Sequence, residues 1–278
     1  MTLRADLTAV VITKNEGPRI EECLKSLHFC KEILVLDSGS TDDTVARATP
    51  LATRVLSYDW PGDGPQRNRG IDLATSSWIL CIDADERVSP ALATELCNTI
   101  AQTEFDGFHI PFQSYYCGRA IKFGDWRKET HLRLFRKHKG HYSTNTVYGA
   151  QGAHCRPVVE GKVGKLRHNI LHYSYPNLET VLTKLNQYST GGAALRAAKG
   201  KSSSVSLACI HGLWSFLRGY VFRFGFLDGK EGFLLALSNG LGTFYRYAKL
   251  VYLQKKSHPC VDVPSDPSSQ QPAASTTL

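Results

Sequence analysis

Three acidic side chains follow soon after a short apolar run, Trp78 to Ile82. Asp83 and Asp85 are the first and third residues after that run. Such a run is typical of a parallel strand covered on both faces, and open α/β sheets bind ligands outside the carboxyl ends of such strands. Two carboxylates there can bind a divalent cation that also contacts a diphosphate. We therefore expect Asp83 and Asp85 to bind Mg²⁺ or Mn²⁺, and a solvated acidic turn is the alternative.

Two earlier apolar runs, residues 7–12 and 33–36, also end in polar turns. Helical segments are expected after both turns, so strand and helix alternate along the chain. This alternation is typical of a nucleotide-binding sheet with parallel strands, in which Asp37 would accept hydrogen bonds from a base or a ribose. An ordinary turn aspartate is the alternative interpretation of Asp37. The candidate residues in the two turns are Thr13, Asn15, Glu16, Asp37 and Gly39.

A loop rich in glycine and proline, residues 60–65, follows a third expected strand at residues 54–57. The helix after this loop should deliver amide and basic side chains to the same edge of the sheet. Its arginines could contact a phosphate, or they could be ordinary surface residues. The candidates from this helix are Gln66, Arg67 and Asn68.

The chain lacks the short motifs of several other enzyme classes. No G-x-G-x-x-G follows the first apolar run, which argues against nicotinamide and flavin enzymes, and no P-loop motif is present. The eight cysteines have no C-x-x-C spacing of a zinc or redox site. Arg4 and Asp6 lie where a signal peptide would need an apolar core. We therefore expect reduced, mostly structural thiols in a cytoplasmic protein.

The charge of the chain is unevenly divided. Residues 1–106 carry 10 Lys and Arg against 17 Asp and Glu, whereas the remainder carries 23 against 8. The basic second half should therefore face something anionic, such as phosphates, nucleic acid or a lipid surface. Nucleic acid is not the expected partner, because no recognition motif is present and the cations are interleaved with aromatic residues.

Helical patterns dominate the chain after Tyr175, over residues 178–195, 205–224 and 232–253. The run Gly232 to Tyr245 is uncharged but too short to span a bilayer. Amphipathic helices rich in aromatic residues and cations are expected to lie in the interface of an anionic membrane, and packing on the preceding domain is the alternative. We therefore expect a membrane-interface extension at residues 177–256 and a disordered Ser/Pro/Gln-rich tail at residues 257–278.

Four segments occur in a specific order: VVITKNEGPRIEECLKSL, EILVLDSGSTDDTV, the helix that contains QRN, and WILCIDADERVSPAL. Together they resemble the nucleotide-sugar half of the family-two inverting glycosyltransferases. The resemblance implies a GT-A fold, an α/β fold with a Rossmann-like mixed sheet. In that family the Asn-Glu pair and the Asp of the first two turns hold the nucleotide, and the Asp-X-Asp segment holds metal and diphosphate. The matching residues here are Asn15, Glu16, Asp37, Asp83 and Asp85.

Later segments are similar to a narrower group, the bacterial lipopolysaccharide-core β-1,4-glucosyltransferases. The similarity is carried by AHCRPVVEGKVGKLRHNILHYSYPNLE, and family segments around Trp126 and Arg133 shape the acceptor side. It implies a domain of residues 1–176 with a nucleotide-sugar half at 1–106 and an acceptor half at 107–176. It also implies transfer of glucose from UDP-glucose to an inner-core heptose of a lipid-linked acceptor, at the inner face of the cytoplasmic membrane. Another lipid-linked acceptor is the alternative.

One position departs from that group, which carries a His-Glu pair before its G-x-V-G-x-L turn. The pair falls on His154 and Cys155 in this sequence. An inverting transferase needs a base to take the proton of the acceptor hydroxyl, and such a base contributes roughly 10²- to 10⁴-fold to the rate. Either Cys155 replaces that base, or another acid such as Glu160 serves, or the protein binds a nucleotide sugar with impaired catalysis. The candidate catalytic residues are Asp85, His154 and Cys155.

Overall fold

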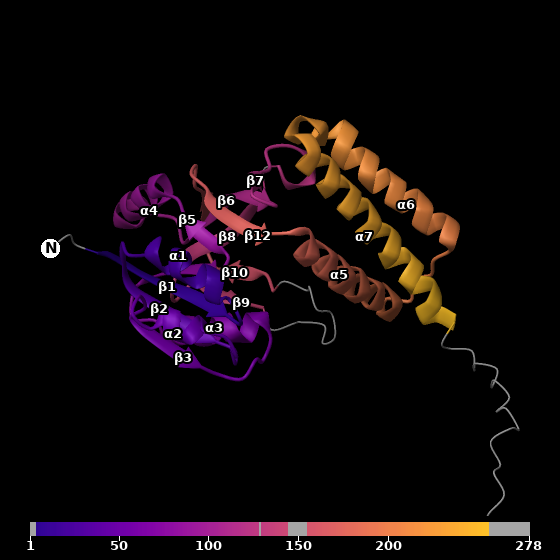
Figure 1. Cartoon of the computed structure of the whole chain (residues 1–278). Coiled ribbons are helices and arrows are strands. Elements are labelled where there is room, and N and C mark those ends of the chain that lie inside the picture. The colour runs from indigo at the N-terminus through magenta and orange to yellow at the C-terminus, as the bar shows by residue number, and fades with distance from the viewer. Residues whose placement is uncertain (1–3, 128, 144–154, 256–278) are drawn as a thin grey trace, which may run out of the picture.

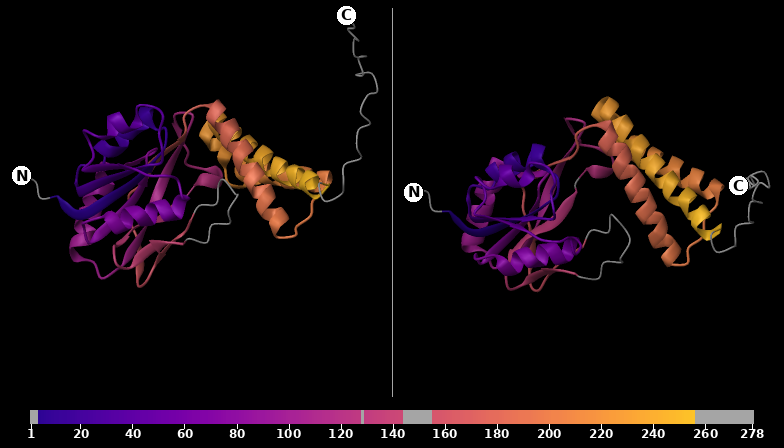
Figure 2. Two further views of the ribbon diagram at one scale, coloured as in Figure 1. Left: turned by 90° about the horizontal axis from the view of Figure 1, so that it is seen from below. Right: turned by 60° about the horizontal axis from the view of Figure 1, so that its bottom comes forward.

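The computed structural model describes residues 4–127, 129–143 and 155–255. The first part is a mixed β-sheet with helices on both faces, and the last part is a set of three long helices beside the sheet (Figure 1; Figure 2). The expected α/β fold with C-terminal helices is therefore confirmed. The tail expected at residues 257–278 lies outside the described residues.

Four parallel strands form one half of the sheet in the order β3-β2-β1-β4. Their register places Thr13 beside Asp37 and Ile12 beside Asp83, so the carboxyl ends of three strands meet at one edge. The turns predicted to carry chemistry are therefore neighbours in space. The strands are β1 (Ala5–Thr13), β2 (Cys30–Asp37), β3 (Arg54–Ser57) and β4 (Trp78–Asp83).

The other half of the sheet continues from β4 in the order β8-β6-β12-β5. β12 runs antiparallel to β5, with His172 opposite Glu86, so the far end of the sheet returns to the acidic segment after β4. A separate hairpin pairs β9 with β10. These elements are β5 (Glu86–Val88), β6 (Gly107–Tyr116), β7 (Arg119–Ala120), β8 (Thr130–Arg136), β9 (Gly140–Tyr142), β10 (Pro157–Val159), β11 (Val163–Lys165) and β12 (Ile170–Tyr175).

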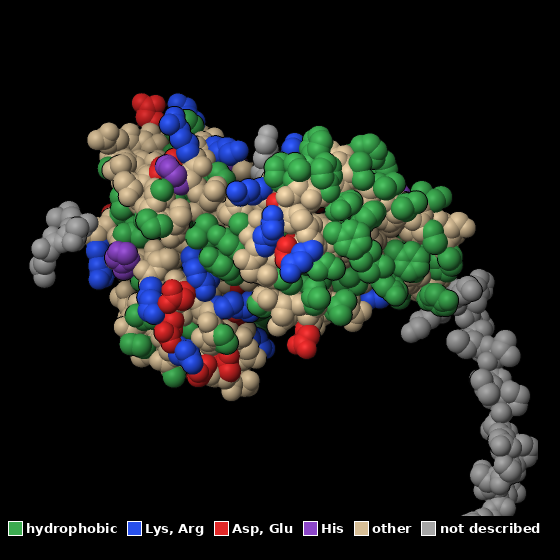
Figure 3. Space-filling model, turned by 45° about the horizontal axis from the view of Figure 1, so that its top comes forward, with side chains coloured by type: hydrophobic (Ala, Val, Ile, Leu, Met, Phe, Trp, Pro, Cys, Tyr) green, Lys and Arg blue, Asp and Glu red, His purple; other side chains and the backbone are tan. Residues whose placement is uncertain are grey.

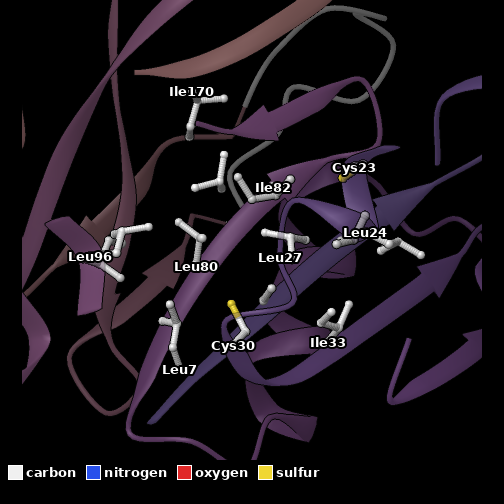
Figure 4. Close-up of a cluster of buried hydrophobic side chains, with 14 of the residues drawn as sticks. Leu7, Cys23, Leu24, Leu27, Cys30, Ile33, Leu80, Ile82, Leu96 and Ile170 are labelled. Carbon is white, nitrogen blue, oxygen red and sulfur yellow. The ribbon is translucent and has the colours of Figure 1, made fainter. Parts of the chain in front are cut away.

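Apolar side chains fill both faces of the parallel half. Leu7, Ala9 and Val11 of β1 pack with α1 and α4 on one face, and Val10 packs with α3 on the other (Figure 4 shows part of the first cluster). The side chain of Ser89 accepts a hydrogen bond from the N–H of Leu92 and caps α4, as Ser at an N-cap does. The helices are α1 (Gly17–Lys25), α2 (Thr44–Ala48), α3 (Asp63–Leu73) and α4 (Pro90–Gln102).

The seven cysteines in the described ranges are free. Cys23, Cys30 and Cys81 are buried within the apolar clusters of the sheet. Burial raises the pKa of each of these three thiols, which keeps them protonated. The expectation of reduced structural thiols is met at these positions.

Three helices form the C-terminal part, α5 (Leu178–Ala198), α6 (Val205–Leu217) and α7 (Gly229–Lys255). The π-turn η2 (Arg218–Phe222) and the short helix η3 (Gly225–Asp228) connect α6 to α7. α6 packs closely on α7 at Gly212. A Cβ added to this glycine would lie only 2.9 Å from the Cβ of Phe244.

A segment long and apolar enough to cross a membrane is present, but it is not the run Gly232 to Tyr245 considered from the sequence. Val205–Phe222 spans 18 residues with a mean hydropathy of 1.2, and 22% of it is buried. By length and composition this is the one such helix among the described residues. The uncharged run Gly232 to Tyr245 lies within α7 and does not meet the same criterion.

Candidate active site

A cleft of about 850 Å³ lies at the carboxyl-terminal edge of the parallel strands and extends to β12 and α5. Residues from both halves of the chain line it, as expected for a donor side and an acceptor side. The predicted site residues among its lining are Thr13, Glu16, Arg67, Asp83, Asp85, Trp126, Arg133 and Cys155. The other predicted residues that the structure describes, Asn15, Asp37, Gly39, Gln66 and Asn68, lie outside this lining. His154 lies outside the described residues.

The carboxylate of Asp83 is held between two arginines. Arg67 Nη2 donates to one oxygen at 2.6 Å, and Arg133 Nη2 donates to the other at 2.9 Å. Burial alone would raise the pKa of Asp83, but the two guanidinium groups hold it well below its usual value. Removing one partner from such a buried pair costs about 3–5 kcal/mol, because the other charge stays uncompensated. Asp83 is therefore fully engaged by protein cations, and its assignment as a metal ligand stays a prediction.

Glu86 completes this charge network. It accepts a hydrogen bond from Arg133 at 2.6 Å and another from the backbone N–H of Asp83 at 2.9 Å. Burial raises the pKa of Glu86 to about 7, while the charge of Arg133 opposes that rise. Glu86 was not among the predicted site residues, although it directly follows the Asp-X-Asp segment.

Asp85 faces His172 rather than an arginine. Asp85 Oδ2 lies 3.6 Å from His172 Nε2, which is also 2.7 Å from the hydroxyl of Ser174. Burial alone would raise the pKa of Asp85, but the hydrogen bond and charge of His172 lower it. Asp85 is therefore an anion at neutral pH, and its partner is an imidazole that the β12–β5 pairing brings to it.

Asp85 and His172 could together bind a divalent cation that a substrate phosphate also contacts. The described residues contain no cluster of three or more His, Cys, Asp or Glu that could hold a metal. Mg²⁺ is commonly bound through only one or two carboxylates when substrate phosphates and water supply the rest. Asp85 at the wall of the cleft meets that condition, and His172 beside it offers a second donor, because a neutral imidazole is a common metal ligand.

The turns after β1 and β2 bind each other. Asn15 has a positive φ of 54° and accepts a hydrogen bond from the N–H of Thr41 at 2.8 Å. Asp37 is 2% exposed and accepts hydrogen bonds from the N–H groups of Gly39 and Ser40 at 3.1 and 3.0 Å. These contacts shape the loops, and the nucleotide-binding roles of Asn15, Asp37 and Gly39 stay predictions.

Two side chains of α3 also hold neighbouring segments. Gln66 donates to the hydroxyl of Ser38 at 3.1 Å. Asn68 pairs with both backbone groups of Tyr142, at 2.8 and 2.7 Å, and so ties β9 to α3. In the structure these two residues position the walls of the cleft and do not line it.

Aromatic side chains form another part of the cleft lining. Trp126 stacks on Tyr175 with ring centroids 5.3 Å apart, and its edge meets Tyr116 at 6.0 Å. Lys184 of α5 lies 4.9 Å from the centre of the Tyr175 ring and donates to the carbonyl of Ser174 at 3.0 Å. Trp126 thus lines the cleft together with a cation from the C-terminal helices, and its acceptor-side role stays a prediction.

Glu129 is a cleft residue that the sequence analysis missed. Its carboxylate lies 2.8 Å from His131 Nε2 and accepts a hydrogen bond from the hydroxyl of Ser114 at 3.4 Å. Burial alone would raise the pKa of Glu129, but His131, His172 and Ser114 lower it. Glu129 is therefore a carboxylate that no Lys or Arg among the described residues neutralises. The one feature of the sequence that could have pointed to Glu129 is its position three residues after Trp126.

The position of Cys155 argues for packing. The side chain is 8% exposed and belongs to the apolar cluster that includes Val10 and Tyr142. A Cβ added to Gly64 would lie 2.7 Å from Cys155 Sγ, so the thiol sits directly against α3. Glu160, the other suggested base, is exposed and lies outside the cleft lining.

Comparison with known proteins identifies the family of the chain. The model of glycosyl transferase family 2 matches residues 8–158. The lipopolysaccharide core biosynthesis glycosyltransferase LpsC of Rhizobium meliloti (strain 1021) is 31% identical over 271 residues, which are 94% of this chain and 98% of that protein. An uncharacterized glycosyltransferase of Rickettsia felis is 31% identical over 256 residues, 88% of this chain and 89% of that protein.

Solved structures of glycosyltransferases are also similar. Glucosyl-3-phosphoglycerate synthase from Mycobacterium tuberculosis, in complex with Mn²⁺, UDP and glucosyl-3-phosphoglycerate, is 28% identical with a TM-score of 0.34, over 41% of this chain and 45% of that one. S. aureus TarS is 16% identical with a TM-score of 0.46, over 70% and 42%. The family match covers more than half of the chain and LpsC aligns over nearly all of it, so the protein is an enzyme that belongs to glycosyl transferase family 2.

Proposed function

We propose that this glycosyltransferase moves a hexose, glucose from UDP-glucose, onto an inner-core heptose of lipopolysaccharide or a related lipid-linked saccharide. The observation that carries the proposal is one cleft that Asp85 and His172 line together with aromatic rings and Lys184. The full-length similarity to LpsC supports the choice of a lipopolysaccharide acceptor. The loop between β1 and α1 would hold the nucleotide, and the wall around Trp126 would hold the acceptor.

The donor side of the cleft suits a nucleoside diphosphate. Asp85 and His172 would hold Mg²⁺ or Mn²⁺, which when bound would neutralise charge on the diphosphate leaving group. Lys14 and Lys184 also line the cleft and add positive charge for the same group. Asp83 has a positioning role, because its ion pairs hold Arg67 and Arg133 in place in the cleft.

Transfer also needs a base on the acceptor side. The acceptor hydroxyl oxygen forms a bond to C1 of the sugar, the bond from C1 to the diphosphate breaks, and the hydroxyl proton passes to a base. We assign that role to Glu129, since it is an ionised carboxylate in the cleft beside the acceptor wall. His131, 2.8 Å away, would orient the carboxylate and share its charge.

A donor panel with a truncated lipopolysaccharide acceptor tests this function. We expect radiolabelled glucose to move from UDP-glucose to deep-core lipopolysaccharide that ends in heptose, and to move much more slowly from UDP-galactose, UDP-N-acetylglucosamine or GDP-mannose. Hydrolysis of each donor without acceptor is measured alongside. Donor hydrolysis without transfer to any lipid-linked acceptor would contradict the proposed acceptor. UDP binding without either reaction would favour a binding protein with impaired catalysis.

The C-terminal helices support a membrane-bound location. Figure 3 shows hydrophobic side chains gathered over the helical part of one face. We define the apolar face by six exposed residues of α6, η2 and α7; the cation Arg223 directly follows η2, and Lys230 lies in the first turn of α7. We propose that this face lies in the interface of an anionic membrane on the cytoplasmic side. The six residues are Ile210, Leu213, Trp214, Phe222, Leu237 and Leu241.

Vesicle sedimentation measures this association. A protein with Ile210→Ser, Leu213→Ser and Trp214→Ser is expected to bind vesicles with phosphatidylglycerol at least about tenfold more weakly, because three large apolar side chains no longer insert. Binding of the unchanged protein should also weaken as salt rises.

Three other exposed apolar residues, all in the sheet domain, provide the control. The changes Phe105→Ser, Val158→Ser and Val163→Ser should leave vesicle binding unchanged. Equal losses in both triple variants, or no binding of the unchanged protein at low salt, would rule out the apolar face as the membrane contact.

A further inference from the structure

A second cavity, of about 310 Å³, lies between the acceptor wall and the three C-terminal helices. Trp126, Tyr175 and Tyr188 line both this cavity and the catalytic cleft, so the two spaces share one wall. Its other sides come from α5, α6 and α7. The cavity is therefore next to the place where the acceptor is expected to bind, on the side that the membrane-facing helices close.

Arg246 of α7 lines this cavity without a counter-charge. Its Nε is buried and has no hydrogen-bond partner, and the residue forms no ion pair with any acid that the structure describes. Burial and the nearby charge of Arg196 both lower the pKa of Arg246. Arg246 is half-buried, its Nε lacks a hydrogen bond, and an anion in the cavity would supply the missing counter-charge.

A glycine on the neighbouring helix lets Arg246 lie where it does. A Cβ added to Gly192 of α5 would lie 2.7 Å from Arg246 Nε and 2.9 Å from its Cδ. Any larger residue at 192 would push the guanidinium away. The close approach of α5 and α7 at this point thus fixes the unpaired cation against the cavity.

The charges in the cavity lining and Arg223 beside it also leave positive charge in excess. Arg218 contacts Asp125 through Nε and Nη2, at 3.2 and 3.0 Å, and Arg223 contacts the same carboxylate at 2.7 Å. One acid therefore serves two arginines, and Arg246 has none. Four hydroxyl groups line the same space, but each already donates a hydrogen bond within the protein, so Arg246 is the donor that is left for an anion. They are Ser189, Ser215, Ser238 and Thr243.

We propose that this cavity binds a phosphate group carried by the acceptor saccharide, with Arg246 as its principal ligand. This inference rests on the proposed function, because it assigns the second cavity to the acceptor of the transfer. A guanidinium group binds phosphate through paired, charge-assisted hydrogen bonds, which suits an arginine without another partner. The volume, at the lower end of ligand pockets, suits a phosphate on a single sugar and not a second nucleotide sugar.

Calorimetry with glucose 6-phosphate tests the site without transfer. The titration is done with UDP and Mn²⁺ at saturation, so that the donor side is occupied. Arg246→Gln is expected to weaken binding at least about tenfold, because charge-assisted hydrogen bonds are lost. Gly192→Ala should weaken it too, since it displaces Arg246 while it keeps the charge and favours the helix. Lys199→Gln, an exposed residue that removes the same charge, should bind as the unchanged protein does.

A second experiment measures the kinetics of sugar transfer to a phosphorylated acceptor and to the same acceptor after phosphatase treatment. Arg246→Gln should raise KM for the phosphorylated acceptor about tenfold or more, with the donor KM and donor hydrolysis unchanged. It should have no effect on the treated acceptor. Melting curves of Arg246→Gln and Gly192→Ala confirm that both variants are folded.

Each outcome decides between distinct explanations. Equal glucose 6-phosphate affinity in all variants, or no binding to the unchanged protein, would overturn the phosphate site. A loss of phosphatidylglycerol vesicle binding in Arg246→Gln, with glucose 6-phosphate binding intact, would assign the arginine to a lipid headgroup and also overturn it. Arg246-dependent binding of glucose 6-phosphate without sugar transfer to any acceptor would support the site and contradict the proposed function.

Discussion

Asp85→Ala is expected to abolish the metal dependence of UDP binding and to lower sugar transfer by about 10³-fold. Asp85 is the anionic side chain at the end of β4 that faces an imidazole, so its loss removes a ligand that no neighbouring arginine competes for. Calorimetric titration of UDP with Mn²⁺, with Mg²⁺ and with EDTA measures the effect. The fold should be retained, because Asp85 takes no part in the ion pairs that hold Arg67 and Arg133.

Two further variants define the metal site more sharply. His172→Ala should weaken metal-dependent UDP binding as well, which would separate an Asp85 and His172 site from the Asp83 and Asp85 site expected from the sequence. Asp72→Ala removes an exposed acid of α3 and should leave binding unchanged. If UDP affinity in Asp85→Ala stayed equal to that of the unchanged protein, with and without metal, the assignment of Asp85 would be wrong.

Glu129→Gln is expected to lower the transfer rate roughly 10²- to 10⁴-fold while the donor KM stays the same. The amide keeps the shape and the contact to His131 but cannot accept the acceptor's proton. Hydrogen bonds and nearby histidines keep the pKa of Glu129 below its usual value, so the carboxylate is already ionised at neutral pH. Single-turnover transfer to the same acceptor, with wild type and variant at saturating donor, provides the measurement.

Cys155→Glu tests the competing hypothesis for the base. If Cys155 has replaced a lost carboxylate, that variant should transfer faster than wild type, and Glu129→Gln should have little effect. We expect the reverse, because Cys155 packs against Gly64 and within an apolar cluster. Glu160→Gln, at an exposed position outside the cleft lining, is the matched control and should behave as wild type.

The parallel half of the fold was predictable from sequence because its signals are local. Apolar runs that end in polar turns placed β1, β2, β3 and β4. Each of these features depends on residues within one turn or one strand. The position of Asp83 and Asp85 at a strand end followed in the same way.

The charge partners of the site were not predictable, because they depend on the register of distant strands. Arg67 and Arg133 lie 16 and 50 positions from Asp83 in the chain, and both reach its carboxylate. The pairing of β12 with β5 then leaves Asp85 to His172. Sequence spacing could not show that two neighbouring aspartates would differ so strongly, one neutralised by arginines and one facing an imidazole.

The sequence by itself determined the family resemblance, the sheet and the acidic strand end, since these follow from local pattern and short motifs. The tertiary structure decided which polar residues face the cleft: it turned Asn15, Asp37 and Asn68 to loop and strand contacts and brought Glu129 to the acceptor wall. It also left Arg246 without a partner between packed helices. The physical reason is that burial and counter-charge are properties of elements brought together in space, and no local pattern encodes them.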